Sequence, residues 1–202
     1  MNSQTQSRTV VFGGSFNPPG LHHREIAEQL SRQFDRVLII PCGFRPDKAA
    51  AKLVTSEQRG WMIEQTFSGL VNVEVLFFDL ESGEFTRTFD LDEKLSREYD
   101  GELWHAVGTD IIQGGANARS EVHQVWYRGE ELWTKLNFAI VSRKDVPASP
   151  ADFPRKSELV QFDNVGSSTE IRKRTASGEP IDHLVVPGLA EFIAREQLYL
   201  NI

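Results

Sequence analysis

The chain has 202 residues, 40% of them hydrophobic, which is enough to close the core of one domain. Its 29 acidic and 22 basic residues give a formal net charge of −7, so the surface as a whole cannot neutralise a nucleic-acid backbone, and we expect no nucleic-acid partner. Cys42 is the only cysteine, which excludes an intrachain disulfide, and the five histidines lack the paired spacing of a structural zinc site, so we expect no metal held by protein ligands alone.

The start of the chain is polar and has no apolar core of the kind that a signal peptide needs. No later stretch approaches the roughly 18 apolar residues of a membrane span. We therefore expect a cytoplasmic protein without a membrane partner, with a flexible N-terminus over residues 1–8 and a single domain over 9–202. The sequence does not specify an oligomeric state.

The first predicted element is a buried strand at 9–12, a short β-branched and apolar run that stops at Gly13 and Gly14. Apolar residues then recur every four positions between 22 and 34, which predicts one buried face of a helix. A second apolar run at 36–40 predicts the next strand, ended by Pro41.

The same alternation continues to the end of the chain. Further helices are predicted at 55–67, 88–99 and 130–136, from Ser167, and at 187–199, and further strands at 71–78, 103–107, 137–141 and 158–162. Alternating strands and helices are typical of an α/β fold, here a Rossmann-like parallel sheet flanked by helices. Segments 113–119 and 146–154 are predicted loops, which either cover a site or merely connect elements at the surface.

Ligands of an open parallel sheet bind at the carboxyl ends of its strands, and the first unusual segment, 13–23, lies at such an end. Two glycines there permit a tight turn in which the backbone approaches a phosphate, and the helix behind them offers free N–H groups. His22 and His23 would add donors. The alternative is a purely structural Gly-Gly turn followed by solvated histidines.

The second segment begins at Ser167, and Glu170 three residues later completes a capping box that needs no functional explanation. Hydroxyls at the start of a helix, followed within a turn by Arg172 and Arg174, nevertheless predict a compact anion site. A third segment ends a strand at Gly108, which lets a ligand approach. Asp110 behind it either accepts hydrogen bonds from ribose hydroxyls or caps the next element.

In this order the three segments resemble the nicotinate and nicotinamide mononucleotide adenylyltransferases, whose signature is GG[ST]F[DN]PxHxGH near the N-terminus and SSTxIR near the C-terminus. The resemblance covers nearly the whole chain. It includes Pro41 to Lys48, similar to the family's lysine-bearing loop, a helix opening at 55–59, and the closing stretch from Val186 to Tyr199. Thr86 and Thr88 lie near the position of its SYT-type element.

The match departs from the family pattern after Pro18. Without a gap, the family's first histidine falls on Gly20 and its small glycine falls on His22, so only His23 keeps its place. Adjacent helical residues diverge by roughly 100°, so we expect His22 and His23 to replace the family's pair only through a rebuilt turn, which Gly20 permits. Asp47 stands where the lysine loop often has histidine.

The resemblance implies a role for each matching residue. For ATP, it implies backbone contacts from Gly13, Gly14, Ser15 and Phe16, a cradle formed by Ser167, Ser168 and Thr169, and a ribose facing Gly108 and Asp110. The groups implied to act on the reacting phosphates are His22 or His23, Arg172 and Lys48. The second substrate would be bound by Thr88, Lys48 and Trp126, with Trp126 stacked on a pyridine ring. It also implies Mg²⁺ carried with ATP.

The implied reaction needs no general base, because a phosphate monoester with a second pKa near 6 is already largely ionised at pH 7. We therefore expect AMP transfer from ATP to a pyridine mononucleotide, with pyrophosphate released, in NAD biosynthesis. Two alternatives remain: transfer to another phosphorylated small-molecule acceptor, and a non-catalytic nucleotide-binding homologue disabled at Gly20.

Overall fold

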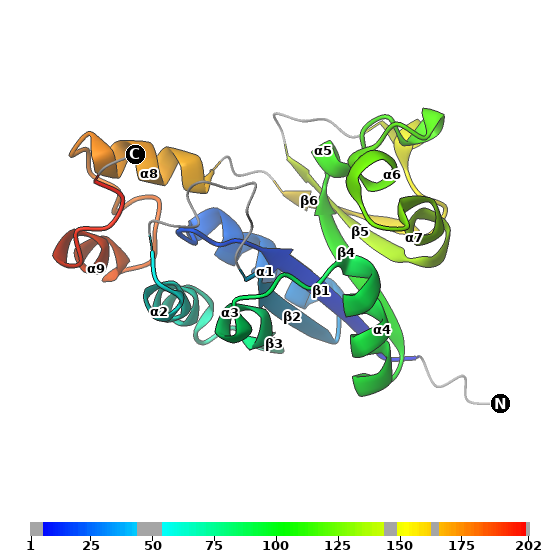
Figure 1. Cartoon of the computed structure of the whole chain (residues 1–202), viewed down its shortest axis with the longest axis horizontal. Coiled ribbons are helices and arrows are strands. Elements are labelled where there is room, and N and C mark those ends of the chain that lie inside the picture. Colours follow the sequence, from blue (N-terminus) through cyan, green and yellow to red (C-terminus); the bar gives the residue numbers. More distant parts are fainter. Residues whose placement is uncertain (1–5, 44–53, 144–148, 163–165, 201–202) are drawn as a thin grey trace.

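A parallel sheet forms the centre of the computed structural model, which describes residues 6–43, 54–143, 149–162 and 166–200 (Figure 1). Within these residues the sheet has six strands in the order β3-β2-β1-β4-β5-β6. Their bounds are β1 Arg8–Gly14, β2 Arg36–Pro41, β3 Val73–Val75, β4 Glu102–Gly108, β5 Asn137–Arg143 and β6 Ser157–Phe162. The predicted α/β class with a Rossmann-like parallel sheet is confirmed.

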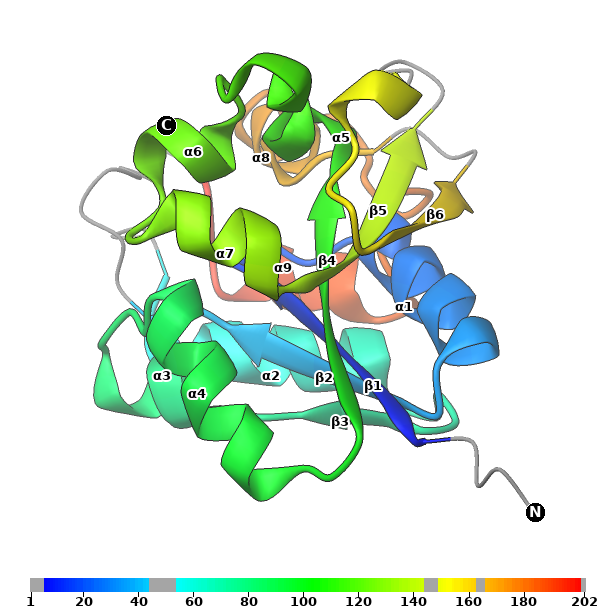
Figure 2. The same cartoon turned by 90° about the vertical axis from the view of Figure 1, so that its right-hand side faces the viewer.

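Helices cover both faces of this sheet (Figure 2). They are α1 Leu21–Gln33, α2 Ser56–Phe67, α3 Phe78–Ser82, α4 Thr88–Glu98, α5 Thr109–Ile112, α6 Glu121–Val125, α7 Gly129–Lys135, α8 Ser168–Ala176 and α9 Leu189–Arg195, with 3₁₀ turns η2 Gly115–Asn117 and η3 Pro150–Asp152. No helix in the described ranges is long and apolar enough to cross a membrane.

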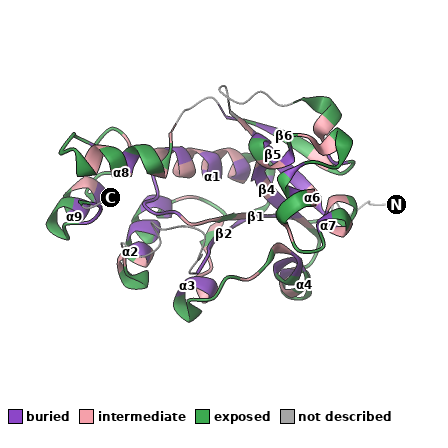
Figure 3. Cartoon of the chain, turned by 45° about the horizontal axis from the view of Figure 1, so that its top comes forward, coloured by how far each residue is buried: buried purple, intermediate pink, exposed green. Residues whose placement is uncertain are grey.

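Strand alternation explains which helix packs on which face. Val10 of β1 belongs to the core under α1, whereas its neighbour Val11 packs with Leu91 and Leu95 of α4 on the opposite face. In Figure 3 the sheet lies between α1 and α4. The two faces are therefore filled by alternate residues of the same short apolar strands.

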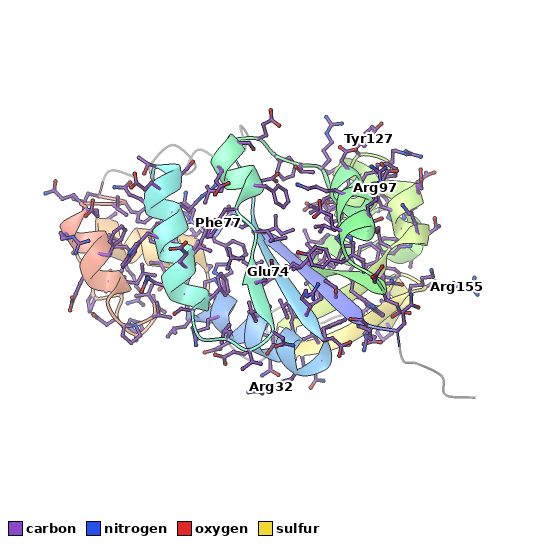
Figure 4. The ribbon with its side chains drawn as sticks, turned by 90° about the horizontal axis from the view of Figure 1, so that it is seen from below. Arg32, Glu74, Phe77, Arg97, Tyr127 and Arg155 are labelled. Atoms are coloured by element: carbon purple, nitrogen blue, oxygen red, sulfur yellow. The ribbon has the colours of Figure 1, made fainter. Side chains whose placement is uncertain are left out.

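Three predicted segments differ from the structure, one strand and two loops. The apolar run at 71–78 pairs with β2 only over Val73–Val75, and the chain then turns into α3. This strand lies at the sheet edge, with Glu74 on it and Phe77 just beyond it lying toward α2 (Figure 4). The predicted loops at 113–119 and 146–154 contain η2 and η3, and the backbone N–H of Ala116 donates to Asp152 across them at 3.1 Å.

The strand order changes direction beside β1. The chain runs outward from β1 through β2 to β3 and then returns to place β4 against the other edge of β1. Such a switch point leaves a crevice at the carboxyl ends of the two strands. Gly14 ends β1 and Gly108 ends β4, so two of the three singled-out segments meet there.

Candidate active site

A cavity of about 990 Å³ lies at this switch point. All three segments of the sequence contribute to its wall, which also includes residues of α4 and α6. The predicted site residues found on the wall are Gly13, Gly14, Ser15, His22, His23, Thr88, Gly108, Asp110, Trp126, Ser167, Ser168 and Thr169. The two motifs that are distant in sequence therefore face one cavity.

The loop after β1 is held by side chains of α8. Arg172 donates from Nη1 to the carbonyl oxygen of Asn17 at 2.6 Å, and Ser168 donates from its hydroxyl to the carbonyl of Pro18 at 2.8 Å. A second guanidinium nitrogen of Arg172 donates to Thr169 at 3.1 Å. These bonds fix the start of α8 against the loop that would cradle a nucleotide.

Arg59 of α2 supports the same loop from beneath. It is 6% exposed and donates to the carbonyl of Ser15 at 3.3 Å and to the carbonyl of Cys42 at 2.5 Å. Burial lowers the pKa of Arg59 from its usual value, although Cys42 and Tyr199 oppose this shift. The buried arginine thus ties the end of β1 to the end of β2 at the cavity.

The two histidine rings do not diverge, contrary to the expectation for adjacent helical residues. Their centroids are 3.8 Å apart. The ring of His22 packs between Gly20 and Gly166, where an added Cβ at either glycine would lie 2.8 Å from its Nδ1. Gly20 is the N-cap of α1 with an extended backbone, so the first turn of the helix is where both rings are gathered.

His23 is oriented by the backbone of Gly20, whose N–H donates to its Nδ1 at 3.1 Å. The ring also meets the edge of Phe16 at a centroid distance of 5.0 Å. Burial, with a smaller effect of His22, holds the pKa of His23 well below its usual value, so the ring is neutral. Because Nδ1 accepts, Nε2 carries the proton and can donate to a phosphate oxygen.

The start of α8 presents its N-terminus to the cavity. Ser167 is the N-cap and accepts from the backbone N–H of Glu170 at 3.1 Å. The Glu170 carboxylate accepts from Arg174 at 2.5 Å, and Arg174 also donates to Glu179 at 3.2 Å. Arg174 is therefore neutralised by two acids and is not on the cavity wall, so the predicted anion site does not include it.

On the opposite side of the cavity, Thr88 opens α4 and Trp126 follows α6. Buried Asp79 orients the approach to α4, because it accepts from the backbone and the hydroxyl of Thr86 at 3.0 and 2.5 Å. This side combines an indole ring with hydroxyl and backbone groups, which suits a flat polar ring.

Between these two sides lies Gly108, which is expected to let a ligand approach the end of β4 closely. An added Cβ would lie 2.2 Å from a carboxylate oxygen of Asp110, which folds over the strand end. The carboxylate and the strand end thus face the cavity together, where a diol could bind.

Three predicted residues are not on the cavity wall or cannot be placed. Phe16 is 1% exposed and supports His23 from beneath, and Arg172 holds the loop from behind; neither lines the cavity. Lys48 lies outside the described residues. Sequence reasoning missed Arg59 and Tyr199, which contact this loop.

A parallel sheet whose switch point joins a glycine-rich loop, two histidines and a helix N-terminus in one cavity defines a nucleotidyltransferase. The comparisons agree: residues 11–174 match the family model described as cytidylyltransferase-like, and the chain belongs to this family.

Curated relatives and solved structures match along nearly their whole length. "Probable nicotinate-nucleotide adenylyltransferase" of Shouchella clausii is 29% identical over 95% of this chain and 96% of its own, and the protein of that name from Methylacidiphilum infernorum is 26% identical over 97% and 94%. The nicotinic acid mononucleotide adenylyltransferase of Plasmodium falciparum complexed with NaAD has a TM-score of 0.77 at 22% identity, covering 96% and 97% of the two chains.

Proposed function

We propose that this nucleotidyltransferase moves AMP from ATP to nicotinate mononucleotide, or to its amide, giving the dinucleotide and pyrophosphate in NAD biosynthesis. The observation that carries the proposal is the shared cavity, with the two phosphate-type motifs on one side and Trp126 and Thr88 on the other. Its volume, about 990 Å³, is at the upper end for small-molecule sites and suits two nucleotides. The names of the curated relatives support this acceptor.

In this mechanism an oxygen of the acceptor phosphate forms a bond to the α-phosphorus of ATP, and the bond from that phosphorus to the bridging oxygen of the β-phosphate breaks. The electron pair leaves with pyrophosphate. Catalysis then consists of positioning and of stabilising charge on the leaving group. The donors would be Nε2 of His23, the N-terminus of α8 and the hydroxyls of Ser168 and Thr169.

His22 would act next to His23, with Lys48 adding positive charge. The loop 13–16 would approach the nucleotide through its backbone, and Asp110 would accept from a ribose. Arg172 would serve by holding the loop at Asn17. Removing one preorganised donor commonly costs on the order of 10²–10³ in rate.

Magnesium would enter with ATP as part of the substrate. The described residues contain no group of three or more His, Cys, Asp or Glu side chains that could hold a metal ion. This fits an ion bound mainly by phosphate oxygens and water, which takes only one or two carboxylates from a protein. Among the carboxylates on the cavity wall, Asp110 is the one that we propose for contact with this ion.

A pyrophosphate-release assay tests the proposal, with Mg·ATP and a panel containing both pyridine mononucleotides and other phosphorylated acceptors. We expect release with a pyridine mononucleotide and loss of turnover in His22→Ala or His23→Ala. Release only with another acceptor would overturn the pyridine assignment. ATP binding by calorimetry without release from any acceptor would identify a non-catalytic homologue.

A further inference from the structure

A polar cluster of the buried His105 and Asp92 and the exposed Lys135 reaches the cavity through His105. His105, on β4, lines the cavity and is 4% exposed. Its Nε2 is 3.1 Å from a carboxylate oxygen of Asp92 on α4, and the other oxygen of Asp92 is 3.2 Å from the ammonium of Lys135 on α7. An imidazole in the middle of an apolar strand is costly unless it is partnered, and this one is partnered on one side only.

The cluster lies on the acceptor side of the cavity. Thr88 and Asp92 are four residues apart on α4 and so share one face, with Asp92 about 6 Å further along the helix. His105 pairs in register with Val11 of β1 and Phe138 of β5, which are apolar. The imidazole is thus the polar group one helical turn below Thr88.

Hydrogen bonding defines which nitrogen of His105 is available. Burial alone raises the pKa of Asp92, but hydrogen bonds and charges from His105 and Lys135 outweigh this and lower it, so the carboxylate is ionised. An ionised carboxylate only accepts, so Nε2 of His105 carries a proton. Nδ1 is then a lone pair when the ring is neutral and a donor when it is protonated.

Nδ1 is also reachable. Every fully buried side-chain nitrogen and oxygen in the described ranges has a hydrogen-bond partner. Nδ1 of His105 has none among the described residues, so it is not fully buried, and the surface of His105 belongs to the cavity wall. This nitrogen is therefore available to a ligand that binds in the cavity against His105.

We propose that His105 is a specificity-determining residue that reads the substituent on the acceptor's ring and makes acceptor preference depend on pH. The proposal rests on the proposed function. A protonated His105 donates from Nδ1 to a ring carboxylate, whereas a neutral His105 accepts from a ring carboxamide N–H. Low pH therefore favours nicotinate mononucleotide and high pH favours nicotinamide mononucleotide.

The titratable groups that pack against His105 are the carboxylate of Asp92 and, through it, the ammonium of Lys135. Those elsewhere on the cavity wall are His22, His23, Cys42, Asp79, Arg87, Asp110, Glu121 and Tyr127. Groups that act on the phosphates affect both acceptors alike. The acceptor phosphate itself titrates identically in both, so a ratio of the two rates removes these effects.

The test measures kcat/KM for both mononucleotides with Mg·ATP between about pH 5.5 and 8.5, a range that spans the ordinary pKa of histidine, about 6.5. We expect the carboxylate-to-amide ratio of kcat/KM to fall as pH rises, by at most about tenfold per unit for one proton. His105→Gln keeps a donor to Asp92 and does not titrate, so its ratio should be independent of pH. His123→Gln is the matched control, since His123 bonds to Ser120 at 2.7 Å and is not on the described wall.

A second variant protects the test against misfolding of His105→Gln. Asp92→Asn removes the counter-charge, so the midpoint of the ratio's pH profile should move to lower pH. The proposal is overturned if the wild-type ratio does not change with pH, or if His105→Gln and Asp92→Asn both retain the wild-type profile. Absence of turnover with either mononucleotide would instead refute the proposed function.

Discussion

The hydroxyl of Tyr199 donates a hydrogen bond to the side-chain oxygen of Asn17, 182 residues earlier in the chain. Both residues are buried, with exposed fractions of 2% and 4%. Burial raises the pKa of Tyr199 despite the nearby Arg172 and Arg59, so the phenol stays protonated and remains a donor. The end of the chain after α9 thus helps to fix the loop that we propose to cradle ATP.

Replacing Tyr199 by phenylalanine should lower both stability and turnover. The buried oxygen of Asn17 loses a donor, which should reduce the free energy of unfolding by about 1–3 kcal/mol. The loop is also positioned less firmly, so kcat for pyrophosphate release should fall more than KM for the acceptor changes. Urea unfolding and steady-state kinetics measure the two effects.

Tyr99→Phe is the control for this change, because Tyr99 ends α4 and packs beside Arg36, outside the cavity wall of the described residues. It should leave kcat unchanged. Equal kinetic effects of the two substitutions would show that Tyr199 has no special relation to the loop.

Position 166 should require glycine for full activity, because the ring of His22 packs directly against it. An added Cβ would lie within 2.8–2.9 Å of three atoms of His22, closer than such contacts allow. Gly166→Ala should therefore displace the ring and lower kcat, by up to the roughly 10²–10³-fold that the loss of one preorganised donor costs. The rate of pyrophosphate release reports this.

Gly60→Ala is the matched control. Gly60 lies inside α2, where the nearest atom to an added Cβ is 3.7 Å away. Alanine should therefore raise the free energy of unfolding by up to about 1 kcal/mol and leave turnover unchanged. The packing argument fails if Gly166→Ala retains full activity.

Arg59→Lys should weaken the join between the ends of β1 and β2. A guanidinium can donate to the carbonyls of Ser15 and Cys42 at once, whereas an ammonium is a compact point charge that is more strongly hydrated. We expect a loss of about 2 kcal/mol or more in the free energy of unfolding and a higher KM for ATP. Arg97→Lys, on the exposed face of α4, should change neither quantity; a similar result for both arginines would contradict the assignment.

The parts of the fold that follow from local patterns were predictable from sequence. Strand β1 follows from a continuous apolar run and helix α1 from a period of about 3.6 residues. The capping residues Thr55 and Ser167 begin α2 and α8 as expected. The strand predicted at 71–78 is much shorter because β propensity does not reveal that only Val73–Val75 reach the neighbouring strand at the sheet edge.

The geometry of the site depends on contacts that no local pattern contains. Spacing on an ideal helix predicts that His22 and His23 diverge, but Gly166, from the far end of the chain, packs on one ring, and the N–H of Gly20 holds the other. A signal for His105 was present, since it is a polar residue inside an apolar strand. Its partner Asp92 could be identified only once α4 was placed on the sheet.

The stability of the protein should depend on pH through His23. Its folded-state pKa is depressed below the ordinary value of about 6.5, so between these two values the unfolded chain binds more protons than the folded one. The free energy of unfolding therefore rises with pH in this window: the contribution is fully present above about 6.5 and is lost as pH falls toward the folded-state pKa, by at most about 1.4 kcal/mol per pH unit.

His23→Gln should flatten this slope, because glutamine at the same capping position can still accept from Gly20 but does not titrate. Chemical unfolding from about pH 5 to 7.5 measures the slope, with His183→Gln, at an exposed position, as the control that should leave it unchanged. An identical slope in wild type and His23→Gln would mean that the imidazole of His23 is protonated as readily in the folded protein as in the unfolded chain.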